Sequence, residues 1–184
     1  WSDEWEHDLR YRPGTMVGDV RLRHRGLGLE LSIAEGVAAQ DPYYVRQIEV
    51  KNLTNVRQDV RIFFSHDLRI AASDIGDTAF YNPYVDGIIH YKNKYAFLFG
   101  GSTASGGLYE YVTGIKDFGG LEGTWRDAED GHLGNNPISQ GSVDSSFSLR
   151  CEIEPNGRAD ALYWMVCGDS LQSVVSGYRD LVRT

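Results

Sequence analysis

The fold class is decided by the stretch Val143–Ile153 (VDSSFSLRCEI), in which large apolar residues recur at every second position. Successive side chains of a β-strand point to opposite faces, so this spacing places Phe147 and Leu149 on the same face of a strand. The same alternation occurs in the stretches 27–33 and 60–70. The sequence therefore predicts a protein built from half-buried strands.

The residues after this stretch predict a hairpin. Asn156-Gly157 favours a two-residue turn, and apolar residues continue to alternate on its far side. Such a turn fixes which residues face one another and joins two apolar faces into one core patch. The predicted pairs are Cys151 with Leu162, Leu149 with Trp164, and Phe147 with Val166.

The second strand of this hairpin is also apolar on its other face, where Tyr163, Met165 and Cys167 alternate. We therefore expect both of its faces to be covered. Cys167 lies roughly 16 Å beyond the residue that faces Cys151, which is too far for a disulfide. Two free thiols favour a reducing compartment, and we predict a cytoplasmic location.

Shorter runs rich in β-forming residues predict further strands, and Asn93-Lys94 predicts a two-residue turn between two of them. Many short strands joined by turns, without βαβ alternation, indicate an all-β fold, an antiparallel sandwich or barrel. The further predicted strands cover 17–24, 44–52, 88–92, 95–100 and 108–113.

Only the end of the chain has helical spacing. Apolar residues recur there at i, i+3, i+4 and i+7, and either Asp169 or Ser170 can cap the first turn. We predict an antiparallel β domain over 1–168 and an amphipathic helix over 169–184 that leads toward a further domain. The apolar positions of the helix are Leu171, Val174, Val175, Tyr178, Leu181 and Val182.

The composition fits one globular domain. The chain has 184 residues, of which 41% are hydrophobic and 12% aromatic, and this is enough to bury a core. No run has membrane-spanning length. The net charge of −8 includes no basic patch, and phosphate binding needs clustered Lys and Arg. Neither a membrane nor a nucleic-acid partner is expected.

A long irregular stretch, 114–142, separates two predicted strands and is the main candidate for function. Loops beyond about 12 to 15 residues are uncommon in compact domains and are often binding loops or lids. Apolar residues within this stretch predict an ordered excursion rather than a disordered linker. These residues are Phe118, Leu121, Trp125, Leu133 and Ile138.

Acidic residues cluster in this stretch at Asp127, Glu129 and Asp130, beside Arg126. Their spacing does not fit a calcium-binding EF-hand. Their residue types suit a pair of glycosidase carboxylates or hydrogen-bond acceptors for a polyol. A solvated turn, in which Arg126 pairs with its neighbours, accounts for them equally well. Both interpretations remain open.

Trp125 adds weight to a sugar ligand. An indole in a polar, glycine-flanked loop either packs against the protein or offers a face on which a sugar ring can stack. Tyr109 and Tyr111 share one face of the preceding strand. They either extend such a platform or are ordinary strand aromatics.

A second loop, 73–83, carries Asp74 and Asp77. Asp near Gly commonly caps turns through its side chain. The functional alternative is a polar rim beside the first loop, which makes both residues candidates for substrate binding.

The five histidines show no zinc-ligand spacing, and the chain contains no phosphate loop or dinucleotide-binding fingerprint. No metal or cofactor is therefore predicted. His66 lies on an apolar strand face and is expected to be a hydrogen-bonded core residue.

Several segments, taken in order, resemble the N-terminal domain of prokaryotic glucoamylases and glucodextranase-type enzymes of glycoside hydrolase family 15. The resemblance covers most of the chain, from Val17 to the final helix. The segments are 63–70 (FFSHDLRI), 74–81 (DIGDTAFY), 90–92 (HYK), 120–131 (GLEGTWRDAEDG) and 140–145 (QGSVDS).

This resemblance implies an antiparallel super-β-sandwich of the galactose-mutarotase-like type, followed by a helical linker and an (α/α)6 barrel. In that family the barrel holds both catalytic glutamates and hydrolyses terminal α-glucosidic bonds with inversion. Neither glutamate has a match here. The implied role of the sandwich is to pack on the barrel and extend a loop toward an α-glucan or α-glucoside oligosaccharide. We expect that loop to be 114–142, with Trp125, Arg126 and Asp127 nearest the sugar.

Two other functions fit the sequence. One is an independent carbohydrate-binding module. The other is a mutarotase-like epimerase, which needs a histidine base and a carboxylate in one cleft. His66, His90 and Glu122 are conceivable members of such a site, although no spacing unites them.

Overall fold

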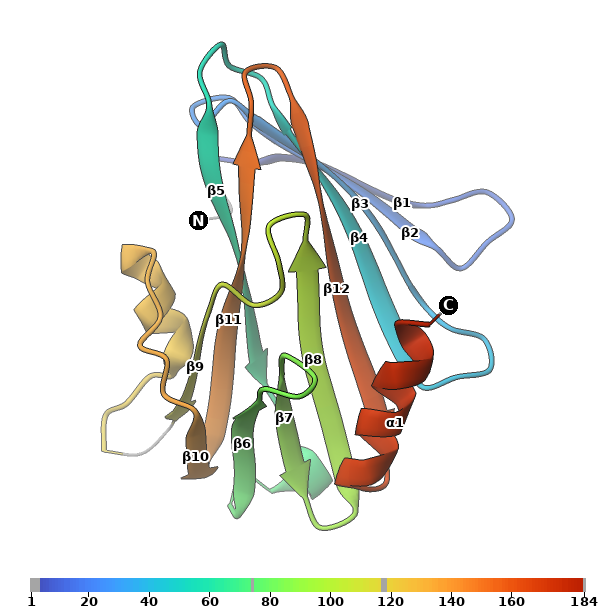
Figure 1. Cartoon of the computed structure of the whole chain (residues 1–184), viewed down its shortest axis with the longest axis vertical. Coiled ribbons are helices and arrows are strands. Elements are labelled where there is room, and N and C mark those ends of the chain that lie inside the picture. The colour runs from blue at the N-terminus through green and yellow to red at the C-terminus, as the bar shows by residue number, and fades with distance from the viewer. Residues whose placement is uncertain (1–3, 74, 117–118, 184) are drawn as a thin grey trace.

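The computed structural model describes residues 4–73, 75–116 and 119–183. Its strands form two antiparallel sheets that pack face to face, and a C-terminal helix covers the outer side of the larger sheet (Figure 1). The predicted antiparallel β-sandwich with one C-terminal helix is confirmed. Within the described residues, no helix combines the length and apolar character needed to cross a membrane.

The larger sheet has nine strands. Its central strand, β12, pairs with β4 on one side and with β8 on the other. In spatial order the strands are β1 (Glu6–Tyr11), β2 (Gly18–His24), β3 (Leu29–Val37), β4 (Tyr43–Asn52), β12 (Arg158–Gly168), β8 (Tyr95–Thr103), β7 (Gly87–Lys92), β6 (Asp77–Asn82) and β10 (Ile138–Gly141).

The smaller sheet has three strands. They lie in the order β5 (Gln58–Asp67), β11 (Val143–Ile153) and β9 (Glu110–Ile115). Phe147 of β11 pairs with Phe64 of β5 and with Tyr111 of β9. The alternating stretch that predicted strand structure is therefore the middle of this sheet.

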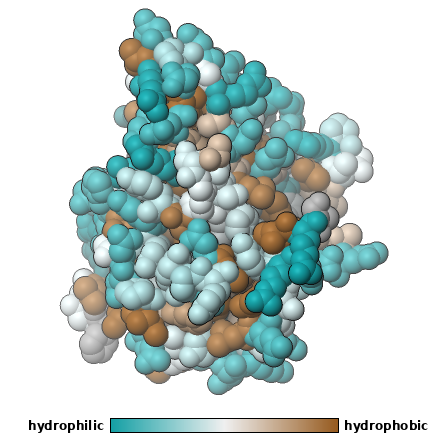
Figure 2. Space-filling view, viewed as in Figure 1, coloured by the Kyte–Doolittle hydropathy of each residue, from teal (hydrophilic) through white to brown (hydrophobic). Residues whose placement is uncertain are grey.

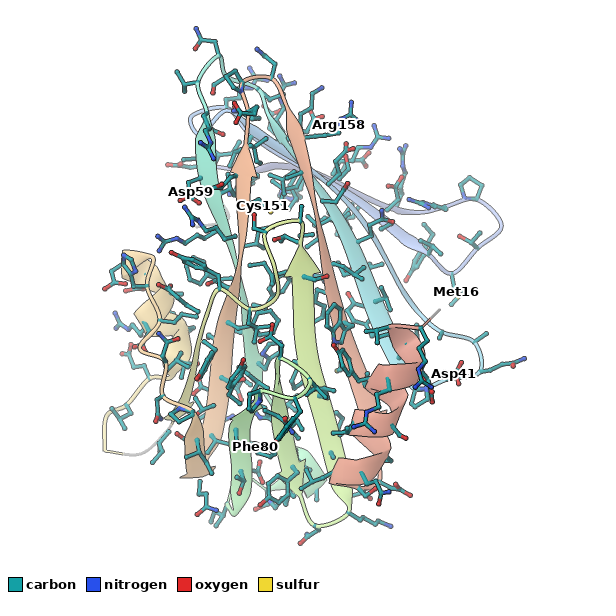
Figure 3. All side chains as sticks on the ribbon, viewed as in Figure 1. Met16, Asp41, Asp59, Phe80, Cys151 and Arg158 are labelled. Atoms are coloured by element: carbon teal, nitrogen blue, oxygen red, sulfur yellow. The ribbon has the colours of Figure 1, made fainter. Side chains whose placement is uncertain are left out.

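The main core lies between the two sheets. Phe147 and Leu149 of β11 are both 0% exposed. Phe64 of β5 stacks on Tyr163 of β12 with ring centroids 4.6 Å apart. Cys151 lies in the same layer of β11 (Figure 3). The apolar face of β11 thus packs across the core against β12.

The helix α1 (Leu171–Leu181) covers the opposite face of β12. Val174 of the helix is 0% exposed and packs in one cluster with Trp164. The side chain of Ser170 caps the helix by accepting a hydrogen bond from the Ser173 N–H at 3.1 Å. The prediction that both faces of β12 are covered is confirmed.

The predicted hairpin between β11 and β12 is wrong. The two strands belong to different sheets, and the chain crosses from one layer to the other at Asn156, whose φ is 56°. Apolar alternation predicts each strand, and the Asn-Gly pair predicts the turn. Neither shows whether the second strand pairs with the first in one sheet or packs against it from the opposite sheet. The pairs that do not form are Cys151 with Leu162, Leu149 with Trp164, and Phe147 with Val166.

Both cysteines are free, with Cys151 buried and Cys167 partly buried. The prediction of two free thiols is therefore confirmed, although the strand register from which it was argued is not the observed one. The predicted two-residue turn at Asn93-Lys94 is also confirmed, because Lys92 pairs with Tyr95.

Three strands were not predicted, and each lacks the apolar alternation used to find the others. All residues of β1 are exposed, β10 has only four residues, and β6 lies within the stretch expected to be the second loop. The strand expected over 60–70 ends at Asp67 and is followed by the short turn η1 (Ile70–Ala72).

The surface seen in Figure 2 is mostly hydrophilic, with apolar residues in scattered patches. This distribution agrees with the net charge of −8.

Candidate functional site

The candidate loop lies on the outer face of the smaller sheet, on the side away from α1 (Figure 1). The expectation that 114–142 has no regular structure is wrong in part. β9 extends to Ile115, the 3-10 helix η2 (Thr124–Asp130) forms in the middle, and β10 precedes β11. The irregular segments are therefore shorter than expected.

The loop has its own small apolar core. Ala128 of η2 and Leu133 are 7% and 4% exposed and pack with Val112 of β9, and Phe63 of β5 lies against this cluster. Phe118 lies outside the described residues. The prediction of an ordered excursion is confirmed by this packing.

Asp144 of β11 anchors the start of η2. Its Oδ2 accepts hydrogen bonds from the Thr124 N–H at 2.6 Å and from the Thr124 hydroxyl at 2.9 Å. The carboxylate is 4% exposed. The pKa of Asp144 is raised above its ordinary value because the carboxyl group is buried. The two hydrogen bonds from Thr124 and the charge of Lys116 offset only part of this effect. These bonds fix one end of the loop to the sheet.

A hollow of about 500 Å³ opens between this loop and β9. Its polar side chains include Glu122, Arg126 and Asp127, and backbone groups at glycine positions form part of its wall. The lining residues are 112–115, 120–124, Arg126 and Asp127. The hollow therefore offers a guanidinium and carboxylates to a ligand.

Trp125 stands beside this hollow and is 42% exposed. Its indole N–H donates to the Glu122 carbonyl at 2.9 Å, and the Arg126 guanidinium lies 5.2 Å from the centre of the indole ring. Arg126 also pairs with the Glu122 carboxylate and, at 3.6 Å, with Glu129. The hydrogen bond from Arg126 lowers the pKa of Glu122 and keeps it ionised. The expected pairing of Arg126 with its neighbours is confirmed.

The three acidic candidates of η2 have different surroundings. Asp127 lines the hollow, Glu129 pairs with Arg126, and Asp130 accepts a hydrogen bond from the His132 N–H at 2.9 Å. Of these three acidic residues, only Asp127 therefore lines the hollow. Within the described ranges, no group of three or more His, Cys, Asp or Glu side chains is placed to hold a metal ion.

The two tyrosines are not part of a platform with Trp125. Tyr111 stacks on Tyr81 of β6 with ring centroids 4.0 Å apart. The Tyr109 ring lies 5.2 Å from the guanidinium of Arg61 and 5.2 Å from that of Arg150. Tyr109 and Tyr111 are therefore ordinary strand aromatics, and they do not extend a sugar-binding platform.

Asp77 does not lie on an open rim. It is 2% exposed on β6, and its carboxylate pairs with the Lys92 ammonium at 2.8 Å. Lys92 also donates to the Ser73 carbonyl at 2.7 Å. This buried ion pair ties β6 to β7. Asp74, the other candidate of that segment, lies outside the described residues.

The histidines proposed for an epimerase lie in the core. His66 Nε2 is 3.1 Å from the Tyr163 hydroxyl, and His90 Nε2 is 2.7 Å from the Ser145 hydroxyl. His66 and His90 are 6% and 1% exposed, whereas Glu122 is on the outer loop. These three groups do not share a cleft, and the prediction of His66 as a hydrogen-bonded core residue is confirmed.

Asp144 is the residue of this region that the sequence pattern did not single out. Asp144, Ser146 and Ser148 form the face of β11 opposite to Phe147, and they are 4%, 0% and 0% exposed. The polar face of a strand in an antiparallel sheet is normally exposed to solvent. Thr124 of η2 provides a polar cover for Asp144 and Ser146. Among the described residues, the buried Ser148 hydroxyl has no hydrogen-bond partner.

Two solved structures share this fold. A bacterial glucoamylase complexed with acarbose matches 99% of this chain and 26% of its own length, with a TM-score of 0.74 and 6% sequence identity. Heparinase III matches 91% of this chain and 22% of its own, with a TM-score of 0.55 and 10% identity. No protein-family model and no curated protein matches the sequence.

At these identities the likeness establishes the fold. The chain spans 26% of the glucoamylase and 22% of heparinase III. It therefore corresponds to one part of each of these larger proteins.

Proposed function

We propose that this chain is the non-catalytic β-sandwich domain of a glycoside hydrolase that acts on terminal α-glucosidic bonds. The observation that carries the proposal is the match of 99% of the chain to part of a bacterial glucoamylase. The resemblance of the segments 63–70 and 120–131 to such domains points in the same direction. The substrate is an α-glucan or α-glucoside oligosaccharide.

In this proposal the catalytic carboxylates belong to a separate barrel. Inverting glycosidases set two carboxyl groups about 6.5 to 9.5 Å apart, with room for a water between them. In the hollow beside η2, Glu122 is engaged by Arg126, and among the described lining residues Asp127 is the only other carboxylate. The sandwich supports the barrel, and α1 begins the connection to it.

The loop around η2 contributes to the substrate pocket in this proposal. Asp127 and Glu122 offer acceptors for sugar hydroxyls, Arg126 offers donors, and the partly exposed Trp125 stands beside them. A small number of placed polar groups next to an aromatic ring is the usual composition of a sugar subsite. The anchoring of Thr124 by Asp144 holds these groups in place.

Expression of the complete reading frame that contains these residues tests the proposal. We expect it to release glucose from maltose, isomaltose or trehalose, and we expect the 184-residue chain alone to release none. Asp127→Asn should raise KM with little change in kcat, because it removes a binding group and no catalytic group. The exposed Asp8→Asn is the matched control. A complete protein without activity on any of the three sugars would contradict the proposal.

An independent carbohydrate-binding module is the second candidate, because the hollow and Trp125 both belong to this chain. Titration of the chain with maltose, trehalose and isomaltose separates the two functions. A module should bind without a barrel, and Trp125→Ala should abolish the binding. If the chain binds none of these sugars, the second candidate is excluded.

A further inference from the structure

A second hollow, of about 610 Å³, lies on the larger sheet near the β1–β2 turn. This turn projects from the side of the molecule opposite to β9 (Figure 1), so the second hollow is separate from the one beside η2. It combines apolar side chains with charged ones. The lining residues are Leu9, Arg10, Tyr11, Met16, Gly18, Val20, Glu35, Gly36, Val37, Ala38 and Tyr44.

One cross-strand row of residues runs through this hollow. The strand register pairs Tyr11 of β1 with Gly18 of β2, and Gly18 with Glu35 of β3. Directly paired residues of antiparallel strands project from the same face of the sheet. Tyr11 and Glu35 thus stand on strands that are two spacings apart, about 10 Å. Gly18 has no side chain to fill the gap between them.

The Glu35 carboxylate is held in place from the side away from this gap. Its Oε2 accepts hydrogen bonds from the Tyr44 hydroxyl at 2.6 Å and from Arg46 Nε at 2.8 Å. Burial raises the pKa of Glu35, but these hydrogen bonds and the charge of Arg46 outweigh it, so the pKa lies below its ordinary value. The carboxylate is therefore ionised at neutral pH.

The other carboxylate oxygen of Glu35 borders the gap. Among the described residues, none donates a hydrogen bond to Oε1. A Cβ at Gly18 would lie only 3.4 Å from this oxygen. Oε1 is thus a fixed acceptor that the missing side chain of Gly18 leaves uncovered.

The charges around the hollow favour a neutral ligand. Arg46 neutralises Glu35 at 2.7 Å, and Asp19 neutralises Arg10 at 3.3 Å. A purely apolar ligand would cover Oε1 of Glu35 without a hydrogen bond, which is costly. A ligand with hydroxyl groups can donate to Oε1, and its apolar face can pack on the ring of Tyr11, which is 69% exposed.

We propose that this hollow is a second carbohydrate-binding site, in which a neutral hexopyranose ring stacks on Tyr11 and donates hydroxyl hydrogen bonds to Glu35 Oε1. Its volume lies within the range of about 300 to 1,000 Å³ that small-molecule sites have. The choice of an α-glucan as ligand rests on the proposed function, whereas the site itself needs no barrel. It would bind a part of the glucan that is separate from the sugar at the η2 loop.

The test follows the backbone amide signals of the ¹⁵N-labelled chain by NMR while maltotriose is added up to about 50 mM. We expect saturable shifts at Gly18 and its neighbours in β2. Tyr11→Ala and Glu35→Gln should each weaken this binding about tenfold, because each removes one contact. Circular dichroism checks that the variants remain folded.

Matched controls carry the same changes outside the hollow. Tyr84→Ala removes another tyrosine, which is 92% exposed. Glu49→Gln removes another glutamate that pairs with an arginine, Arg158, at 3.1 Å. Both variants should leave the binding at Gly18 within twofold of the original.

Gly18→Ala tests the gap itself, because it covers Oε1 while Tyr11 and Glu35 both remain. We expect it to weaken binding about tenfold, through loss of the hydrogen bond to the sugar. Gly134→Ala is its control, since a Cβ there meets nothing within 4 Å.

Three results would overturn the proposal: no saturable shift in β2, shifts confined to the η2 loop, or equal binding of cyclohexanol. The last would show that the apolar surface alone makes the site. None of these results depends on glucosidase activity of the complete protein. Failure of this site and failure of the proposed function can therefore be told apart.

Discussion

At the scale of single residues, buried polar groups with defined partners determine how the loop and the core are held. Asp144 is the clearest case, because one carboxylate oxygen accepts two hydrogen bonds from Thr124. The sequence could not identify this role, since Asp144 and Thr124 meet only after the loop folds back. Asp77 shows the same limit, because an Asp beside Gly76 resembles a turn residue and yet pairs with Lys92 inside the sheet.

Removal of the Asp144 carboxylate should destabilise the protein. Asp144→Ala leaves the buried Thr124 N–H without its acceptor, whereas the Thr124 hydroxyl keeps Ser146 Oγ at 3.0 Å. The loss costs about 1 to 3 kcal/mol in the free energy of unfolding. Urea denaturation measures this change. Asp144→Asn retains an acceptor oxygen and should cost less, and the exposed Asp127→Ala should change stability by less than about 0.5 kcal/mol. Equal effects of the three variants would contradict the anchoring role.

The buried histidines should make stability depend on pH. Burial lowers the pKa of His90 from 6.5 to about 4, and burial together with His90 lowers the pKa of His66. Below pH 6.5 the unfolded chain binds protons that the folded chain excludes, so stability falls as pH falls toward 4. His90 alone should account for roughly 2 kcal/mol between pH 7 and pH 5.

The variant His90→Asn isolates this contribution, because an amide can keep the hydrogen bond to Ser145 but does not titrate. Its free energy of unfolding should fall less than that of the wild type over the same pH range. Chemical denaturation at each pH provides the measurement. Parallel pH profiles for the two proteins would show that His90 titrates normally in the folded state.

At the scale of elements, close packing on both faces of β8 limits the size of the side chains that fit on this strand. A Cβ at Gly100 would lie 2.7 Å from the Trp164 indole nitrogen, and a Cβ at Gly101 would lie 2.7 Å from Leu149 Cδ1. The two glycines therefore allow β8 to be covered by α1 and β12 residues on one side and by β11 on the other. Alternation predicted the strand, but not the small residues that its neighbours require.

Gly101→Ala should destabilise the protein by about 1 to 3 kcal/mol, because the added methyl group overpacks the core against β11. Gly134→Ala is the matched control, since a Cβ there meets nothing within 4 Å. Thermal unfolding should show a clear decrease in Tm for the first variant and little change for the second. Similar Tm values would mean that β8 can shift to accept the methyl group.

At the scale of the whole molecule, the sequence predicted the sandwich and most strands but not their arrangement. Alternation in Val143–Ile153 and 60–70 reports which face of a strand is buried. The first strand was found where expected, and the second ends three residues early, at Asp67. Alternation does not report which strand lies alongside. The hairpin expected at Asn156-Gly157 failed for this reason, because β11 and β12 find their partners among strands distant in the chain.

The crossing at Asn156 makes the protein divisible into two parts that can reassemble. β12 pairs with β4 on one side and β8 on the other. A chain ending at Asn156 would therefore keep its other strands but lack the central strand of the larger sheet. A synthetic peptide spanning 157–184 should restore the missing strand and α1, with recovery of native circular dichroism at equimolar ratio. Such a pair would serve as a complementation reporter, whose signal depends on the two halves being brought together.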